Sequence, residues 1–127
     1  MPKPRFNPLT KVGEFRLMLY PKKYQTSLEF YRDVLGFPIT YQWDRAKSKG
    51  VMFDTGSATI ELLWDDDQKQ PEGCDVSLEV KDVWKLAKSL HGKARLVHGI
   101  QDNPWGDTSF CIKDPSGFDI IFFTKNK

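Results

Sequence analysis

The chain has 127 residues, of which 39% are hydrophobic and 13% aromatic, so it can bury a core and is too apolar to be disordered. Its 19 basic and 17 acidic residues leave a formal net charge of +2, which describes a mixed surface and excludes the strongly basic face of a nucleic-acid-binding protein. The sequence has neither the run of roughly 20 apolar residues that spans a membrane nor the apolar segment of a secretory signal, so we expect a cytoplasmic protein with no membrane partner.

The order of the predicted elements occurs twice along the chain. Residues 14–64 and residues 74–125 each read as a strand, a helix and three further strands. The first set is EFRLMLY, TSLEFYRDVLG, PITYQWD, GVMFDTG and ATIELLW, and the second is CDVSLEV, DVWKLAKSLHG, KARLVHG, TSFCIKDPSG and FDIIFFT. An internal repeat of about 50–60 residues indicates two βαβββ modules related by an approximate twofold, which is an α+β fold. Residues 1–13 are then an N-terminal extension and residues 65–73 a polar linker within a single domain.

Both predicted helices carry start and stop signals. Thr26 and Glu29 form a capping box at the start of the first helix, and Gly36 ends it in a left-handed conformation. Asp82 starts the second helix and Gly92 closes it. The predicted buried faces are Leu28, Tyr31, Val34 and Leu35 in the first helix and Val83, Leu86, Ala87 and Leu90 in the second.

The predicted strands alternate between apolar and mixed positions, so each sheet has a helix-facing side and an open side. The helix-facing residues are Phe15, Leu17, Leu19, Ile60, Leu62, Val76, Leu78, Val80, Ile120 and Phe122. The open side carries Arg16, Met18, Tyr20, Thr59, Glu61, Leu63, Asp75, Ser77, Glu79, Asp119, Ile121 and Phe123. Two such sheets related by a twofold would bring their open sides around a common concavity, which is the default place for a small ligand.

Four segments of the chain carry a family resemblance: SLEFYRDVLGF (27–37), ATIELLW (58–64), VSLEVKDV (76–83) and PWGDTSFCIKDPSG (104–117). They resemble the glyoxalase/bleomycin-resistance/dioxygenase group, also called the vicinal oxygen chelate superfamily. The PWGxxxFxxxDPxG arrangement is most similar to the bleomycin-resistance branch. The resemblance implies paired βαβββ modules, a homodimer, and binding cavities between modules or between subunits.

The resemblance also places the four metal-ligand positions of the metal-dependent members at Arg16, Glu61, Asp75 and Ile121. The internal repeat aligns the same pairs, Arg16 with Asp75 and Glu61 with Ile121. Only Glu61 matches a usual family ligand; Asp75 can hold a hard cation, whereas Arg16 has no lone pair to give and Ile121 has no donor atom. Because a catalytic zinc or iron site normally has three protein ligands, we expect no metal cofactor. An alternative is that Arg16 replaces the cation by pairing with Glu61 or Asp75.

Strand alternation and the resemblance together predict one ligand pocket. Its predicted lining is Arg16, Met18, Trp43, Glu61, Asp75, Ser77, Trp105, Ile121 and Phe123. If Arg16 pairs with Glu61, the remaining carboxylate of Asp75 favours a cationic ligand.

Several other residues are candidates for either a functional or a structural role. Trp43 and Trp105 serve either as the mouth of the pocket or as packing at an interface, and Trp84 is expected to pack in the second module. His98 is either a structural residue or a metal ligand or general base. The cysteines, Cys74 and Cys111, have the spacing of reduced thiols rather than of a metal pair.

Two classes of function remain. We favour a small-molecule binding protein that sequesters or senses an organic ligand without metal chemistry, because the ligand positions are incomplete. The alternative is a metal-dependent lyase, isomerase or dioxygenase with a divergent site built around Glu61.

Overall fold

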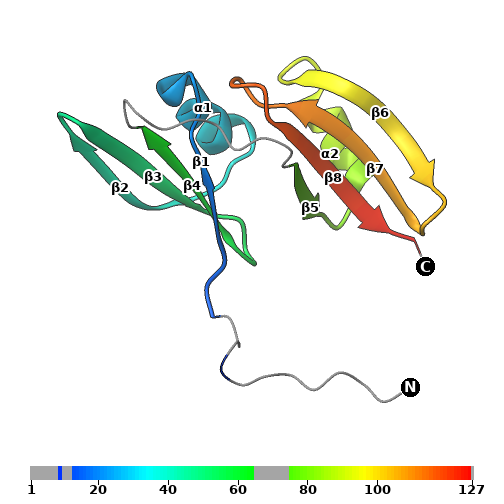
Figure 1. Cartoon of the computed structure of the whole chain (residues 1–127). Helices are drawn as coiled ribbons and strands as arrows, with labels where there is room; N and C mark the ends of the chain where they lie inside the picture. The colour runs from blue at the N-terminus through cyan, green and yellow to red at the C-terminus, as the bar shows by residue number, and fades with distance from the viewer. Residues whose placement is uncertain (1–8, 10–12, 65–74, 127) are drawn as a thin grey trace.

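Each half of the chain folds into a four-stranded mixed sheet, and Figure 1 shows the two sheets side by side. The computed structural model describes residues 9, 13–64 and 75–126, so the predicted linker and most of the predicted N-terminal extension lie outside the described residues. Sheet A contains β1 (Arg16–Leu19), β2 (Ile39–Arg45), β3 (Ser48–Asp54) and β4 (Thr59–Trp64). Sheet B contains β5 (Val76–Glu79), β6 (Arg95–Asn103), β7 (Asp107–Lys113) and β8 (Asp119–Lys125). The helical segments are α1 (Tyr24–Glu29), the π-helical η2 (Phe30–Val34) and α2 (Val83–Leu90).

The two sheets have the same topology. Their strand orders are β1-β4-β3-β2 and β5-β8-β7-β6, with β1 parallel to β4, β5 parallel to β8 and the other neighbours antiparallel. Met18 is paired with Glu61 in sheet A, and Ser77 is paired with Ile121 in sheet B. The fold prediction of two βαβββ modules is therefore confirmed, and the register agrees with the alignment of Glu61 with Ile121.

The helix ends agree only in part with the capping signals. The first helix begins at Tyr24, with Lys23 at its N-cap and no capping side chain. The predicted capping box is wrong, because Thr26 lies inside α1 rather than at its start. Gly36 has a φ of 72°, as a left-handed C-terminal residue requires. In the second helix Asp82 accepts the N–H of Lys85 at 3.0 Å, which confirms that start.

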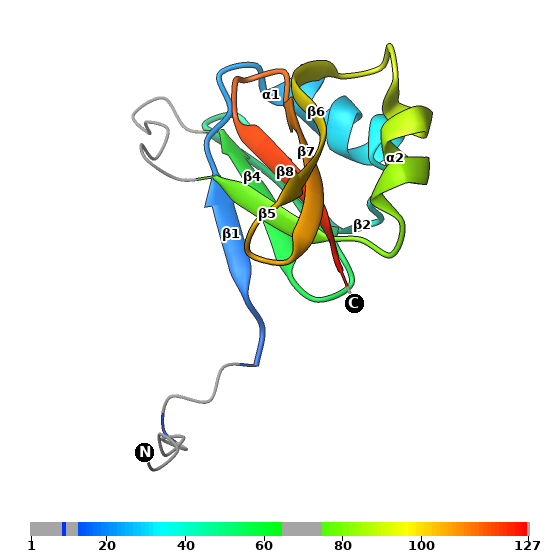
Figure 2. The ribbon, with the colours of Figure 1, turned by 90° about the vertical axis from the view of Figure 1, so that its right-hand side faces the viewer.

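The alternation of the strands is confirmed in the core. The helix-facing side chains join one cluster of buried or partly buried residues that includes Leu19, Leu62, Val76, Ile120 and Phe122, packed with Leu28 and Tyr31 of the first helical segment and Val83 and Leu90 of α2. Figure 2, turned by 90°, shows α2 along one side of sheet B.

Two side chains that we expected to pack are exposed. Phe15 is 60% exposed and lies just before β1. Trp84 is 47% exposed because successive helical residues point about 100° apart and its neighbour Val83 takes the buried position.

The two modules meet where the first helical segment contacts the turn between β7 and β8. Tyr31 donates a buried hydrogen bond to Asp114 Oδ2, and the hydroxyl groups of Ser27 and Ser116 lie 2.8 Å apart. Ser116 also accepts the backbone N–H of Lys23 at 3.3 Å. Figure 1 shows this turn, drawn in orange, beside α1. The β7–β8 turn is therefore also a contact between the modules.

The outer strands of the two sheets are irregular. The pairing of β2 with β3 shifts register between Ile39 and Tyr41, and the pairing of β6 with β7 shifts twice, around His98. The exposed apolar side chains of β6 are those of Leu96, Val97 and Ile100. Within the described residues, no helix has the length and hydropathy of a membrane-spanning segment.

Candidate functional site

The open face of sheet B contains a hollow of about 360 Å³. Its lining residues come from β5, β6, β7, β8 and the β6–β7 connection: Ser77, His98, Gln101, Asn103, Trp105, Asp107, Ser109, Ile121 and Phe123. Ile121, Phe123 and Trp105 supply apolar surface, and the other lining residues supply hydroxyl, amide, imidazole and carboxylate groups. A concave surface with apolar walls and a few convergent polar groups is typical of a small-molecule site.

A chain of hydrogen bonds fixes the polar wall of this hollow. Asn103, which is 8% exposed, accepts a bond from Gln101 Nε2 at 2.9 Å. Its own Nδ2 donates to Asp107 Oδ1 at 2.7 Å and to Ser109 Oγ at 2.9 Å. Since these side chains bond to Asn103, and Asp107 also to Trp105, they are held in place before any ligand arrives, which lowers the entropy cost of binding.

The same network holds Trp105 at the rim. Its side chain is 73% exposed, and its indole Nε1 donates to Asp107 Oδ2 at 3.1 Å. An exposed indole held by a hydrogen bond offers a flat apolar surface with little rotamer freedom left to lose. Trp105, predicted to stand at the mouth of a pocket, is one of the residues that line this hollow.

His98 enters the hollow from β6. Its Nδ1 lies 2.9 Å from the carbonyl oxygen of Gly99, and with the proton on Nδ1 this contact is a hydrogen bond that leaves Nε2 as an acceptor. Both register shifts of β6 occur at this residue. The imidazole is thus available for a ligand's N–H or O–H group.

Cys111 of β7 lies between its cross-strand partners His98 and Ile121, both of which line the hollow. It is a free cysteine, 3% exposed. Burial raises the pKa of its thiol, and the nearby carboxylates of Asp119 and Asp75 raise the pKa further. The thiol is therefore protonated at neutral pH and is a poor nucleophile.

The predicted pocket residues separate into two groups in the structure. Ser77, Trp105, Ile121 and Phe123 line the hollow of sheet B, and Asp75 is exposed just before β5. The second group, Arg16, Met18, Trp43 and Glu61, belongs to sheet A and does not line this hollow.

On sheet A, Glu61 occupies the centre of the open face. It is 5% exposed, and its cross-strand partners are Met18 and Met52. Within the part of the chain that the structure describes, its carboxylate has no hydrogen bond or ion pair. The carboxylate oxygens are not among the fully enclosed polar atoms, so they remain free to accept a hydrogen bond, and this position is a candidate for contact with a ligand or with another molecule.

Trp43 covers the neighbouring part of the same face. It is paired with Gly50, where a Cβ atom would overlap the indole ring. Its Nε1 donates to Ser48 Oγ at 3.2 Å, and its ring centroid lies 5.8 Å from that of Tyr41. The absence of a side chain at Gly50 therefore lets the indole lie flat on the sheet.

The alternative in which Arg16 pairs with Glu61 or Asp75 is not what the structure shows, and the charge of Glu61 has only a minor effect on Arg16. Arg16 Nη2 binds Glu14 Oε2 at 2.9 Å, and both side chains are about half exposed. This hydrogen bond with Glu14 is the main reason that the pKa of Arg16 is raised and that the pKa of Glu14 is lowered. Glu14, two residues away along the strand, is within easier reach than the buried Glu61. An exposed pair of this kind stabilises the fold very little.

The residues at the family's metal positions do not fit a metal. Arg16 and Ile121 offer no donor atom, so only the two carboxylates, Glu61 and Asp75, remain at these positions. Among the described residues, no group of three or more His, Cys, Asp and Glu side chains gathers as a metal site would require. We therefore derive no metal-dependent step at these positions.

Sequence reasoning missed five residues of the sheet B hollow: His98, Gln101, Asn103, Asp107 and Ser109. Ser109 could have been found, because a hairpin register through residues 114–117 pairs it with Phe123 on the open face. The β6 residues could not, since the two register shifts change which side chains of that strand point to the open face.

Comparison with known proteins agrees with this fold. The family model described as Glyoxalase/Bleomycin resistance protein/Dioxygenase superfamily matches residues 15–122, so the chain belongs to that superfamily. No curated protein sequence gives a significant match.

Several solved structures share the fold at low sequence identity. TioX from Micromonospora sp. ML1 superposes with a TM-score of 0.74 at 19% identity, covering 90% of this chain and 99% of TioX. A lactoylglutathione lyase from Agrobacterium tumefaciens gives 0.69 at 17% identity, covering 93% and 96% of the two chains. A superfamily member from Sphaerobacter thermophilus gives 0.73 at 18% identity, covering 91% and 98%. At these identities the likeness concerns the fold alone.

Proposed function

We propose that this protein is a small-molecule binding protein that sequesters or senses an organic ligand in the hollow of sheet B, without metal chemistry. The proposal is supported by the polar side chains between Gln101 and Asp107, which are already hydrogen-bonded to one another and to Trp105. The apolar side chains of Ile121 and Phe123 line the same hollow. Such a hollow orients a ligand, whereas no lining residue is placed as an activated nucleophile.

The charges of the lining favour a neutral or cationic ligand. Asp107 is the carboxylate of the hollow, and none of the lining residues is Lys or Arg. Trp105 presents an indole face, on which a flat or cationic group is attracted by the ring electrons. A planar aromatic or heteroaromatic molecule with a hydrogen-bonding edge fits these features best.

We also propose a homodimer in which the open face of sheet A contacts a second copy. Glu61 forms no hydrogen bond or ion pair with a described residue, and Met18 beside it is 45% exposed. A twofold contact would cover this face and is the commonest way to do so. Sedimentation equilibrium should give the dimer mass at micromolar concentration; a monomer would overturn this arrangement.

Tryptophan fluorescence tests the ligand site. We expect cationic and neutral aromatic compounds to change the emission in a saturable way, and Trp105→Phe to remove most of that change. Trp84→Phe is the matched control, because Trp84 lies on α2 away from the hollow. If anionic compounds alone quench, or if both variants respond alike, the proposed site is wrong. Native mass spectrometry of the purified protein would identify a ligand that remains bound.

A second candidate function is supported by Glu61 alone. A divergent metal-dependent lyase, isomerase or dioxygenase would use this buried carboxylate, and one similar fold is named a lactoylglutathione lyase. Stoichiometric metal that is lost in Glu61→Gln would favour this candidate over a binding protein.

A further inference from the structure

A second hollow, of about 440 Å³, lies at the junction of the two modules. It is formed by three segments: residues 22–23 before α1, residues 93–95 at the start of β6, and residues 113–117 of the β7–β8 turn, with Phe30 beside them. None of these residues lines the hollow on the open face of sheet B. The two hollows are therefore separate sites.

Basic side chains dominate this junction. Five of its lining residues are cationic: Lys22, Lys23, Lys93, Arg95 and Lys113. Lys113 is paired with Asp119 at 2.6 Å, whereas the other cations form no ion pair with any described residue. A gathering of unpaired cations in a hollow produces a positive potential that attracts anions.

Asp114 is the one carboxylate among the described lining residues, and it accepts hydrogen bonds from neutral groups rather than forming an ion pair with these cations. Asp114 Oδ1 accepts the N–H groups of Ser116 at 2.9 Å and Phe118 at 2.8 Å. Its Oδ2 accepts the hydroxyl of Tyr31 at 3.0 Å. Five cationic lining residues against this single carboxylate leave the hollow with a net positive charge.

The pairing of β6 with β7 places two cations directly opposite each other. Arg95 is the cross-strand partner of Lys113, and like charges in that position destabilise a sheet. The other charged cross-strand pairs of the described strands join opposite charges: Asp44 with Lys49, Asp107 with Lys125 and Lys113 with Asp119. A bound anion would relieve the repulsion at Arg95 and Lys113.

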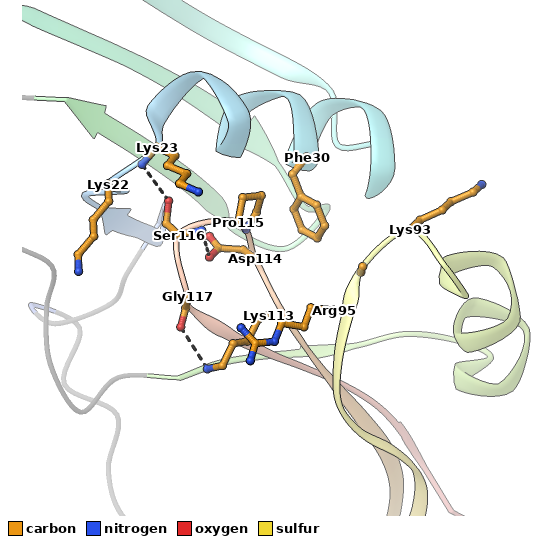
Figure 3. A pocket seen from close by; sticks show the side chains of 11 residues that line it. Lys22, Lys23, Phe30, Lys93, Arg95, Lys113, Asp114, Pro115, Ser116 and Gly117 are labelled. Carbon is orange, nitrogen blue, oxygen red and sulfur yellow. Dashed lines mark hydrogen bonds between the residues drawn. The ribbon is translucent and has the colours of Figure 1, made fainter.

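Figure 3 shows how these side chains lie. Arg95 and Lys113 are side by side below the turn, Lys23 lies on the other side of Ser116, and Lys93 points away from the hollow. We propose that this junction binds a small molecule that carries two or more anionic groups, with phosphate esters as the best fit. Arg95 and Lys113 hold one group, since guanidinium forms paired hydrogen bonds with phosphate, and Lys23 holds the second. The cations occupy a hollow rather than a long stripe, which favours a small molecule over nucleic acid.

Isothermal titration calorimetry with inorganic pyrophosphate tests the proposal. We expect saturable 1:1 binding that weakens with added salt. Arg95→Gln and Lys23→Gln should each weaken it about tenfold or more, as the loss of a hydrogen bond to a charged group does. Lys85→Gln removes the same charge from an exposed site on α2 and should leave the affinity within about twofold. Trp105→Phe should not affect pyrophosphate binding, so this site and the proposed ligand site succeed or fail separately.

Three results would overturn the proposal. One is the absence of saturable binding at millimolar pyrophosphate. Another is an equal loss of affinity in Lys85→Gln and Arg95→Gln, which would indicate attraction by net charge alone. The third is tighter binding of a short oligonucleotide or of anionic vesicles than of pyrophosphate. Melting temperatures of the variants close to that of the wild type would show that each loss reflects binding rather than unfolding.

Discussion

Tyr31 and Asp114 join the two modules through one hydrogen bond, 3.0 Å long, between side chains that are 0% and 4% exposed. The two residues lie 83 positions apart in the sequence. Burial raises the pKa of Asp114, and its hydrogen bonds from Phe118, Tyr31 and Ser116 offset part of that effect. The contact couples a helical turn of one module to the β7–β8 turn of the other.

Removing the phenol group of Tyr31 should weaken this junction. Tyr31→Phe leaves Asp114 Oδ2 buried without its donor, so we expect the free energy of unfolding to fall by about 1–3 kcal/mol. Urea denaturation measures the change. The matched variant is Tyr41→Phe, whose side chain is 56% exposed and which should stay within about 0.5 kcal/mol of the wild type. An equal loss of stability in the two variants would show that the hydrogen bond from Tyr31 to Asp114 does not stabilise the fold.

Alkaline pH should destabilise the protein through two tyrosines. Burial, and then the charge of Asp44, raises the pKa of Tyr24 to about 12, and burial raises the pKa of Tyr31 well above its ordinary value. The unfolded chain has tyrosine pKa values of about 10, so above that pH the native state binds more protons than the unfolded state. The stabilisation that these two tyrosines contribute is complete below about pH 10 and is lost as the pH rises through their pKa values in the folded protein.

Tyr24→Phe separates the two contributions. The hydroxyl of Tyr24 is buried with no hydrogen-bond partner among the described residues, so its removal should leave stability at pH 7 unchanged or slightly higher. The decline of stability above about pH 10 should become shallower than in the wild type. Denaturation curves at a series of pH values test both statements, and an unchanged decline would show that Tyr24 does not contribute.

A methyl group at position 50 should displace Trp43. Gly50→Ala places a Cβ atom inside the space of the indole ring, so we expect a loss of about 1–3 kcal/mol in the free energy of unfolding and a shift in tryptophan emission. Gly99→Ala is the control within another strand, because nothing lies within 4 Å of its added Cβ atom. A wild-type emission spectrum and stability for Gly50→Ala would show that the ring does not rest on this glycine.

We expect no stoichiometric binding of metal at the four positions where metal-dependent members of the superfamily carry their ligands. After dialysis against zinc, nickel, iron or manganese, elemental analysis should find well under one equivalent per chain, because Arg16 and Ile121 supply no donor atoms. Glu61→Gln serves as the comparison. One equivalent in the wild type that disappears in this variant would contradict the prediction.

The parts of the fold that local chemistry determines could be read from the sequence. The alternation of Leu17 and Leu19 with Met18 indicated which side of the strand faces the core and which side is open. Gly36 indicated where the first helical segment ends. These features depend on residues a few positions apart, and the internal repeat extended them from one module to the other.

The start of the first helix could not be read in this way, because a distant residue contributes to it. The N–H of Lys23 bonds to Ser116, and the hydroxyl of Ser27 contacts the same side chain, 89 positions away. The helix therefore begins earlier than the local signal of Thr26 and Glu29 indicates. The position of His98 depends in a similar way on the irregular pairing of β6, which strand alternation does not describe.

The irregular pairing of β2 and β6 also bears on how the protein behaves at high concentration. Each is the strand at one free edge of its sheet, and a regular free edge is a template on which the strand of another molecule can add. The register shifts at Ile39 and His98 interrupt the row of backbone groups that such a strand would need. Exposed apolar residues such as Leu96 and Ile100 therefore lie on an edge that disfavours continuous β-aggregation.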